Sequence, residues 1–205
     1  MVRIYLTRHG QTEWNVELRM QGQLDSALTE LGVRQTEALG IYLSNVDFSV
    51  IYASSSARAI HSAELIRGNR PLEIIPEDDL REISLGSWEG RLFSETEFLY
   101  PKMADKFWNH PEQYIPPNGD GETFEELRSR VGKKLDEIAQ KHQGETILVV
   151  THGVALKTLY AYFRYQSIGD IANSPSPQPA CLCLVEKKHG IWNIMRWNER
   201  IITTY

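Results

Sequence analysis

Strand-like and helix-like segments alternate along this chain, and this alternation limits its fold more than any other feature. Segments rich in β-branched and aromatic residues predict four strands, at residues 2–7, 48–53, 72–75 and 146–150. Helical spacing of apolar residues predicts helices at residues 29–45, 57–66 and 154–164, and another that begins after Thr123. Strands joined by helical crossovers form parallel sheets that helices cover on both faces. We therefore predict an α/β fold, a three-layer α/β/α sandwich around a mostly parallel sheet.

The C-terminal part of the chain predicts one antiparallel element. Residues 181–186 and 191–197 are two strand-like segments on either side of a short turn at Lys188-His189-Gly190, which is typical of a hairpin. This hairpin brings the central sheet to about six strands. A length of 205 residues fits one domain, so we expect a single domain over residues 1–205.

One long segment does not fit the alternation. Residues 91–117 are rich in aromatic residues and interrupted by prolines. Connections of this length tend to be functional or to carry helices of their own, so we predict a helical lid over about residues 91–122. Two interpretations of its aromatic residues stay open, an apolar substrate wall that includes Phe93, Phe98 and Trp108, or ordinary packing beneath the lid.

Composition and charge exclude several classes of protein. The net charge of −5 argues against a nucleic-acid partner, because binding to a phosphate backbone needs a basic surface. No apolar run approaches the roughly 20 residues that cross a bilayer, and no signal peptide is recognisable, so we expect a soluble cytoplasmic protein without membrane contact. Cys181 and Cys183 are too few for a disulfide framework and favour core packing.

Two of the predicted strands end in the same way. The first runs into Arg8-His9-Gly10 and the fourth into His152-Gly153. Ligands of open α/β sheets bind outside the carboxyl ends of the strands, so both histidines are expected at one site. A glycine after each histidine allows a tight turn and close approach of a ligand to the backbone.

Two further segments bring charge to the same edge of the sheet. Arg58 lies in the first turn of a predicted helix, where a cation is mildly unfavourable, and a bound anion would remove the conflict. The loop after the third strand supplies carboxylates to the same edge, and the candidates are Glu82, Glu89 and the pair Asp78 and Asp79. Two histidines, two arginines and a carboxylate suit phosphoryl transfer, in which an imidazole attacks, guanidinium groups hold the oxygens and an acid protonates the leaving group.

The motifs resemble, in order, those of the histidine phosphatase superfamily, which is also called phosphoglycerate mutase-like. The matching segments are Leu6 to Asn15 (LTRHGQTEWN), Gln21-Gly22, Leu28 to Gly32 (LTELG), Arg58-Ala59, Glu82 with Gly86 to Gly90 (GSWEG), and Thr151-His152-Gly153. They cover residues 4–153, about three-quarters of the chain. Any single motif could arise by chance, but the ordered set is specific.

The resemblance implies a role for each matching residue. His9 is expected to become a phosphohistidine, and Glu82 to protonate the leaving group and then activate water. Arg8, Arg58 and His152 would hold the phosphoryl oxygens and stabilise the charge of the transition state, with Asn15 assisting. Gln21 and Gly22 would line the substrate side, and Gly153 completes the expected set of binding residues. No metal and no cofactor are implied, and the expected partner is a small-molecule phosphate ester. A homodimer stays open.

Two departures and three rival functions bear on the activity. Ser62 stands where the family usually has threonine, and Ile83-Ser84-Leu85 lacks the tyrosine and the downstream lysine by which glycolytic mutases hold phosphoglycerate. The second departure favours a phosphatase over a phosphoglycerate mutase-type phosphotransferase, which is the main rival. The other rivals are a metal-dependent hydrolase that uses His9, His61 and His152 with a carboxylate, and a non-catalytic phosphate-binding module.

Overall fold

A mixed six-stranded sheet forms the centre of the protein, with its strands in the order β3-β2-β4-β1-β5-β6. The computed structural model describes residues 1–201. The strands are β1 (Val2–Arg8), β2 (Val50–Ser54), β3 (Ile74–Glu77), β4 (Thr146–Thr151), β5 (Leu182–Lys188) and β6 (Ile191–Glu199). The first four are parallel to one another, whereas β5 pairs antiparallel with β1 and with β6. This arrangement confirms the predicted α/β class and the C-terminal hairpin.

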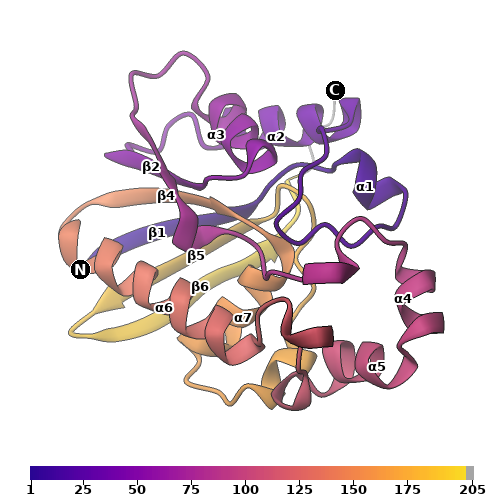
Figure 1. Cartoon of the computed structure of the whole chain (residues 1–205). Coiled ribbons are helices and arrows are strands. Elements are labelled where there is room, and N and C mark those ends of the chain that lie inside the picture. Colours follow the sequence, from indigo (N-terminus) through magenta and orange to yellow (C-terminus); the bar gives the residue numbers. More distant parts are fainter. Residues whose placement is uncertain (202–205) are drawn as a thin grey trace.

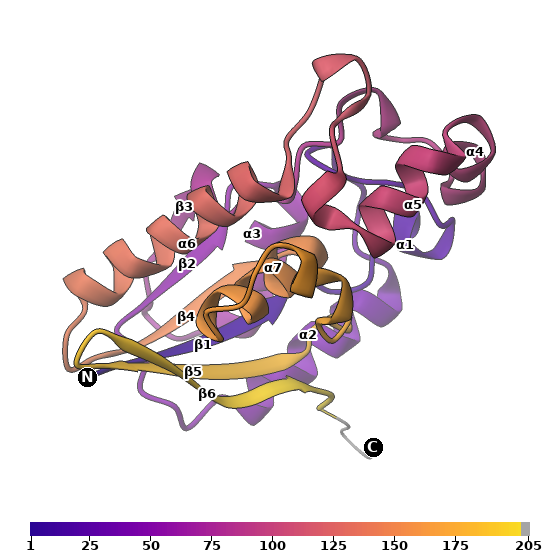
Figure 2. The same ribbon diagram turned by 90° about the horizontal axis from the view of Figure 1, so that it is seen from below.

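Helices cover both faces of this sheet, which confirms the predicted three layers. The helices are α1 (Glu13–Val16), α2 (Glu30–Tyr42), α3 (Ala57–Arg67), α4 (Phe93–Leu99), α5 (Pro101–Asn109), α6 (Phe124–Lys141) and α7 (Gly153–Phe163). Helices α2 and α3 lie on one face and α6 and α7 on the other (Figures 1 and 2). Alternate residues of β1 therefore enter different cores: Ile4 and Leu6 pack toward α6 and α7, and Tyr5 toward α2 and α3.

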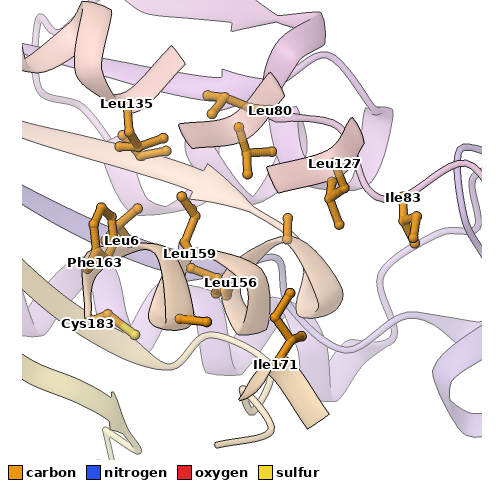
Figure 3. Packing of buried hydrophobic residues seen from close by; sticks show 14 of the residues in the cluster. Leu6, Leu80, Ile83, Leu127, Leu135, Leu156, Leu159, Phe163, Ile171 and Cys183 are labelled. Atoms are coloured by element: carbon orange, nitrogen blue, oxygen red, sulfur yellow. The ribbon is translucent and has the colours of Figure 1, made fainter. Parts of the chain in front are cut away.

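The larger core lies beneath α6 and α7 and reaches into the lid. Leu127 and Leu135 of α6 pack there with Leu156 and Leu159 of α7 (Figure 3). At roughly 25 cal/mol per Å² of apolar surface, burying one such side chain contributes about 1.5–3 kcal/mol. Cys183 belongs to this cluster, and both cysteines are buried and free, as predicted.

Helix α6 begins where the sequence predicts. The Thr123 side chain accepts a hydrogen bond from the Glu126 N–H at 3.2 Å, and the Glu126 carboxylate accepts one from the Thr123 N–H at 2.8 Å. This capping box satisfies two N–H groups that a helix start leaves unpaired. The preceding chain returns from the lid, so the cap fixes where the lid rejoins the sandwich.

Two elements differ from the prediction. Strand β3 begins at Ile74 instead of residue 72 and continues through Pro76 to Glu77. A proline is tolerated there because β3 is an edge strand and needs ladder hydrogen bonds on one side only. The short helix α1 was not predicted. The lid contains α4 and α5, as expected for a helical insertion. None of the described helices is long and apolar enough to cross a membrane.

Candidate active site

A cavity of about 330 Å³ opens at the carboxyl ends of β1 and β4, where β4 lies between β1 and β2. Eight of the nine site residues predicted from the sequence line it: Arg8, His9, Asn15, Gln21, Gly22, Arg58, Glu82 and Gly153. The ninth, His152, is fully buried, and its ring packs edge-on against His9 with 5.2 Å between the ring centres. The structure therefore brings together residues from five separate segments of the chain.

His9 follows directly from β1 and has a defined tautomer. Its Nδ1 lies 2.8 Å from the Gly10 carbonyl oxygen, which can only accept, so Nδ1 carries the proton and Nε2 has the lone pair. Arg58 donates its Nε–H to Nε2 at 3.3 Å. Burial, with the positive charges of Arg58 and Arg8, holds the pKa of His9 well below its usual range. The imidazole is therefore neutral at pH 7, with its unprotonated nitrogen at Nε2.

The glycine after His9 is required by close packing. A Cβ on Gly10 would lie 2.5 Å from the Gly32 carbonyl oxygen, and a Cβ on Gly32 would lie 2.0 Å from the Gln11 carbonyl oxygen. The first turn of α2 therefore packs directly on the loop that follows His9. Thr29 caps α2 by accepting a hydrogen bond from the Gly32 N–H at 3.0 Å. These contacts join the motif from Leu6 to Asn15 to the motif from Leu28 to Gly32.

His152 forms the N-cap of α7 at the end of β4. Its Nε2 lies 2.7 Å from Ser54 Oγ and 3.3 Å from Ser56 Oγ, whereas its Nδ1 has no hydrogen-bond partner among the described residues. Burial, and then the nearby charge of Arg58, holds the pKa of His152 well below its usual range. His152 is thus a second neutral imidazole, and its buried Nδ1 is without a hydrogen-bond partner in the part of the chain that the structure describes.

Arg8 is a buried cation with a hydrogen-bond donor that is unpaired among the described residues. Burial lowers its pKa, although an arginine remains charged. One Nη donates to the Pro177 carbonyl oxygen at 3.0 Å, and the buried Nε has no partner among residues 1–201. Gly153 leaves room for the guanidinium, since a Cβ there would lie 3.4 Å from Arg8 Cζ. The free Nε–H can bind an anion in the cavity.

Arg58 is held by a carboxylate that the sequence did not reveal. Asp25 accepts from Arg58 Nη1 at 2.7 Å and also from the Ala57 N–H at 2.8 Å, at the start of α3. The expectation that a bound anion relieves a cation in this turn is therefore incomplete, because Asp25 already does so. Arg58 also donates to the Gly22 carbonyl oxygen at 2.8 Å. No spacing rule connects residues 25 and 58, so only the folded chain shows this pair.

Glu82 is anchored to the start of α7. Its Oε1 accepts from the N–H groups of Ile83 and Ala155, both at 3.0 Å, and its Oε2 accepts from Val154 N–H at 3.0 Å. It carries the only carboxylate among the described residues that line the cavity.

The competing carboxylates are engaged elsewhere. Glu89 accepts from the N–H groups of Gln23 and Leu85 at 2.9 and 3.0 Å. Asp78 accepts from Ser55, and Asp79 pairs with Lys134 at 3.5 Å. Glu89 also explains Gly22, which has φ +52° and whose Cβ would lie 2.2 Å from Glu89 Oε1. Glu89 therefore shapes the loop around Gly22, which lines the cavity.

The polar wall opposite α7 is built from the loop after β1. Gln21 Nε2 donates to Thr12 Oγ1 at 2.6 Å, while Gln21 Oε1 is buried without a hydrogen-bond partner among residues 1–201. Asn15 also lines the cavity, and its Oδ1 accepts the Thr12 N–H at 3.1 Å, so its amide N–H groups are not used in this contact. This wall offers both donors and an acceptor to a ligand.

Some aromatic residues of the lid line the cavity and others pack in the core beneath it. Each of the two interpretations of these residues, an apolar wall or ordinary packing, therefore accounts for part of the lid. Phe93, Phe107 and Trp108 line the cavity. Tyr114 is buried and packs with Phe107 at 5.0 Å between ring centres. The inclusion of Phe98 in the wall was wrong, because 84% of its surface is exposed and it does not line the cavity.

Several lining residues were missed by the sequence reasoning. Lys157 is half-buried, makes no ion pair or hydrogen bond with a described residue, and has its pKa lowered by burial. It lies four residues after Gly153, on the same face of α7, so helical spacing could have found it. Arg19 also lines the cavity but pairs with Glu17.

The structure does not bring together the three histidines that the metal-dependent alternative requires, His9, His61 and His152. His61 is exposed on α3, away from the cavity, whereas His9 and His152 are buried. Within residues 1–201, no group of three or more histidine, cysteine, aspartate or glutamate side chains could hold a metal ion.

Comparison with known proteins agrees with the sequence motifs. The family model described as histidine phosphatase superfamily (branch 1) matches residues 4–200. A metal-independent phosphoserine phosphatase from Arabidopsis thaliana is 33% identical over 202 residues, which are 97% of this chain and 82% of that protein. Phosphoglycerate mutase-like protein 4 from the same plant is 35% identical over 163 residues, or 78% of this chain and 70% of that protein. The solved structure of Bacillus stearothermophilus YhfR superposes with a TM-score of 0.93 at 39% identity, covering 97% of this chain and 98% of that one.

Proposed function

The chain belongs to the histidine phosphatase superfamily, branch 1, and from this premise we propose that it hydrolyses small phosphomonoesters through a phosphohistidine on His9. One observation carries the proposal. The unprotonated Nε2 of a neutral histidine meets Arg8, Arg58 and a single carboxylate in one cavity. A nucleophile, cations for the phosphoryl oxygens and a proton donor are the groups that this reaction needs.

In the first step, the Nε2 lone pair of His9 attacks phosphorus and the bond to the leaving oxygen breaks. Glu82 gives its proton to that oxygen, and the alcohol departs. Oε2 is the better place for this proton, because it accepts one backbone N–H whereas Oε1 accepts two. Arg8 and Arg58 balance the charge on the phosphoryl oxygens.

In the second step, water attacks the phosphohistidine. The Glu82 carboxylate takes a proton from the water, the phosphorus–nitrogen bond breaks, and inorganic phosphate leaves with His9 neutral again. The scheme uses no metal or cofactor, because the two guanidinium groups supply the positive charge. We propose a phosphorylated small molecule as the partner, with no nucleic acid and no membrane. A homodimer, the cytoplasmic location and the single domain stay predictions.

Mutase activity is the second candidate, since a relative is described as mutase-like. The residues after Glu82 favour hydrolysis. Ile83 and Leu85 line the cavity with apolar side chains, where the glycolytic mutases that the sequence resembles hold their substrate by polar groups. The segment after Glu82 therefore gives the cavity no polar side chain with which to hold a phosphoglycerate between two phosphoryl transfers.

Rapid-quench kinetics with p-nitrophenyl phosphate tests the proposal. We expect a burst of nitrophenol and a phosphoenzyme that is labile in acid and stable in base, as a phosphoramidate is. His9→Ala should lose both the burst and turnover, whereas His61→Ala, on the exposed face of α3, should keep both. An acid-stable adduct, or turnover retained in His9→Ala, would contradict the mechanism.

Two controls separate the rivals. Incubation with 3-phosphoglycerate should release phosphate faster than it forms an isomer, and the reverse would establish the mutase. Activity that disappears in EDTA and returns with a divalent metal would establish the metal-dependent hydrolase.

A further inference from the structure

Two serine hydroxyls at the end of β2 contact one nitrogen of His152. Ser54 Oγ lies 2.7 Å and Ser56 Oγ 3.3 Å from Nε2, and all three side chains are buried. Ser54 Oγ also lies 3.3 Å from Ser56 Oγ, and the shorter distance of 2.7 Å to Nε2 makes Ser54 the main partner of His152. Ser54 is the last residue of β2, which pairs with β4, so the sheet itself fixes the hydroxyl beside the imidazole.

The other nitrogen of His152 is buried and has no partner among the described residues. Because the ring is neutral, it carries one proton, on Nδ1 or on Nε2. A serine hydroxyl can donate or accept, so both tautomers fit the distances. The choice decides whether the unpartnered Nδ1 presents an N–H group or a lone pair.

The chemistry of the ligand resolves this choice. Phosphoryl oxygens accept hydrogen bonds, so a lone pair on Nδ1 would repel them, whereas an N–H would bind them. We infer that Ser54 donates its hydroxyl proton to Nε2 of His152, and thereby keeps the ring proton on Nδ1 for a phosphoryl oxygen. Ser54 is then a positioning residue that acts through His152, and the inference rests on the proposed phosphatase function.

A buried N–H without an acceptor is costly, and a phosphoryl oxygen removes that cost. Loss of Ser54 leaves Nε2 with only the longer contact to Ser56, so the ring no longer has a strong preference for the Nδ1–H form. Orthovanadate, which resembles the pentacoordinate phosphorus, should therefore bind roughly 5- to 150-fold more weakly to Ser54→Ala.

Nuclear magnetic resonance of protein labelled with ¹⁵N-histidine observes the tautomer directly. With orthovanadate bound, we expect the His152 resonances of an imidazole protonated on Nδ1 and unprotonated on Nε2. The variant His152→Gln assigns these resonances by their loss. A His152 ring protonated on Nε2 in the vanadate complex would overturn the inference.

Variants supply a second, independent measurement. Ser54→Thr keeps the hydroxyl and should restore most of the vanadate affinity that Ser54→Ala loses. Thr158→Val is the matched control, because it removes a buried hydroxyl on α7 that has no hydrogen-bond partner among residues 1–201. It should leave vanadate binding unchanged, and unchanged binding in Ser54→Ala as well would contradict the role of Ser54.

The phosphoenzyme assay distinguishes this inference from the proposed function. If wild type forms no phosphohistidine, the proposed function fails and the role of Ser54 in phosphoryl binding falls with it. If wild type forms the phosphohistidine but His152 is protonated on Nε2, only the inference about Ser54 fails.

Discussion

Removal of the Asp25 carboxylate should damage both the fold and the site, because one side chain serves both. Its two oxygens accept from Arg58 Nη1 and from the first N–H groups of α3, at residues 57 and 58. The Arg58 side chain is 1% exposed, whereas the Asp25 side chain is 34% exposed. Asp25→Ala therefore leaves a buried guanidinium without its carboxylate and a helix without its cap.

The expected decrease in the free energy of unfolding is the sum of these two losses. Breaking a fully buried ion pair costs about 3–5 kcal/mol, but water can reach Asp25, so we expect about 1–2 kcal/mol for the pair. Loss of the cap adds about 1 kcal/mol. The free energy of unfolding should fall by about 2–3 kcal/mol in Asp25→Ala and by less in Asp25→Asn, whose amide oxygen can still cap α3.

Asp25→Ala should also lower the catalytic activity. Without Asp25, the guanidinium of Arg58 can rotate away from His9, and we expect kcat/KM for p-nitrophenyl phosphate to fall by about 10- to 100-fold, as for a loss of about 1.4–2.8 kcal/mol of transition-state binding. Urea unfolding followed by circular dichroism, and steady-state kinetics on the same samples, measure the two effects. Glu30→Gln is the control, since its ion pair with Arg34 is on the surface, and neither quantity should change. Wild-type kcat/KM in folded Asp25→Ala would refute the reasoning.

Three further predictions concern the acid, the lid and pH. Glu82→Gln should slow the burst from alkyl phosphates by about 10²–10⁴-fold and spare the burst from p-nitrophenyl phosphate, whose leaving group needs no proton; equal losses would remove Glu82 from the acid role. Phe93→Ala should change the preference between bulky and small esters, whereas Phe98→Ala, on the outer surface, should not; kcat/KM across an ester series decides. The pKa of both His9 and His152 is lowered in the folded state, so the unfolded chain binds more protons below about pH 6.5. The free energy of unfolding should therefore fall as the pH drops below that value, by up to about 1.4 kcal/mol per pH unit for each histidine. Urea unfolding at pH 5.5 and 7.0 should show a smaller difference in His9→Gln, and an unchanged difference would contradict this.

Local sequence signals predicted the sandwich well because each acts within a few residues. The capping box at Thr123 and Glu126 needs only one turn of helix, and it is present in the structure. Both ends of β3 were misplaced, because Pro71 and Pro76 were interpreted as the boundaries of the strand, whereas an edge strand accommodates Pro76 and continues to Glu77.

The candidate site was predictable where the topology alone brings residues together. His9 and His152 follow adjacent parallel strands, β1 and β4, so their meeting follows from the fold class. Asp25 and Ser54 were not found. Their partners, Arg58 and His152, are 33 and 98 residues away, and no sequence motif contains both members of either pair. Sequence spacing carries no information about such contacts, since the packing of loops on the sheet determines them.

The two arginines have different relations to protein acceptors, and the difference suits the proposed mechanism. Arg8 lines the cavity and has a buried Nε–H without a partner among residues 1–201, so in the proposed mechanism it can bind the phosphoryl group of the substrate at once. Arg58 instead donates Nε–H to the lone pair on Nε2 of His9. In the proposed mechanism that lone pair forms the bond to phosphorus, so the Arg58 donor would lose its acceptor as the reaction proceeds and would become free for a phosphoryl oxygen. An interaction that forms only as the new bond forms stabilises the transition state more than the bound substrate, which is the condition for raising kcat. Asp25 and the Gly22 carbonyl meanwhile hold the rest of the guanidinium in place, so this exchange of partners needs no movement of the helix.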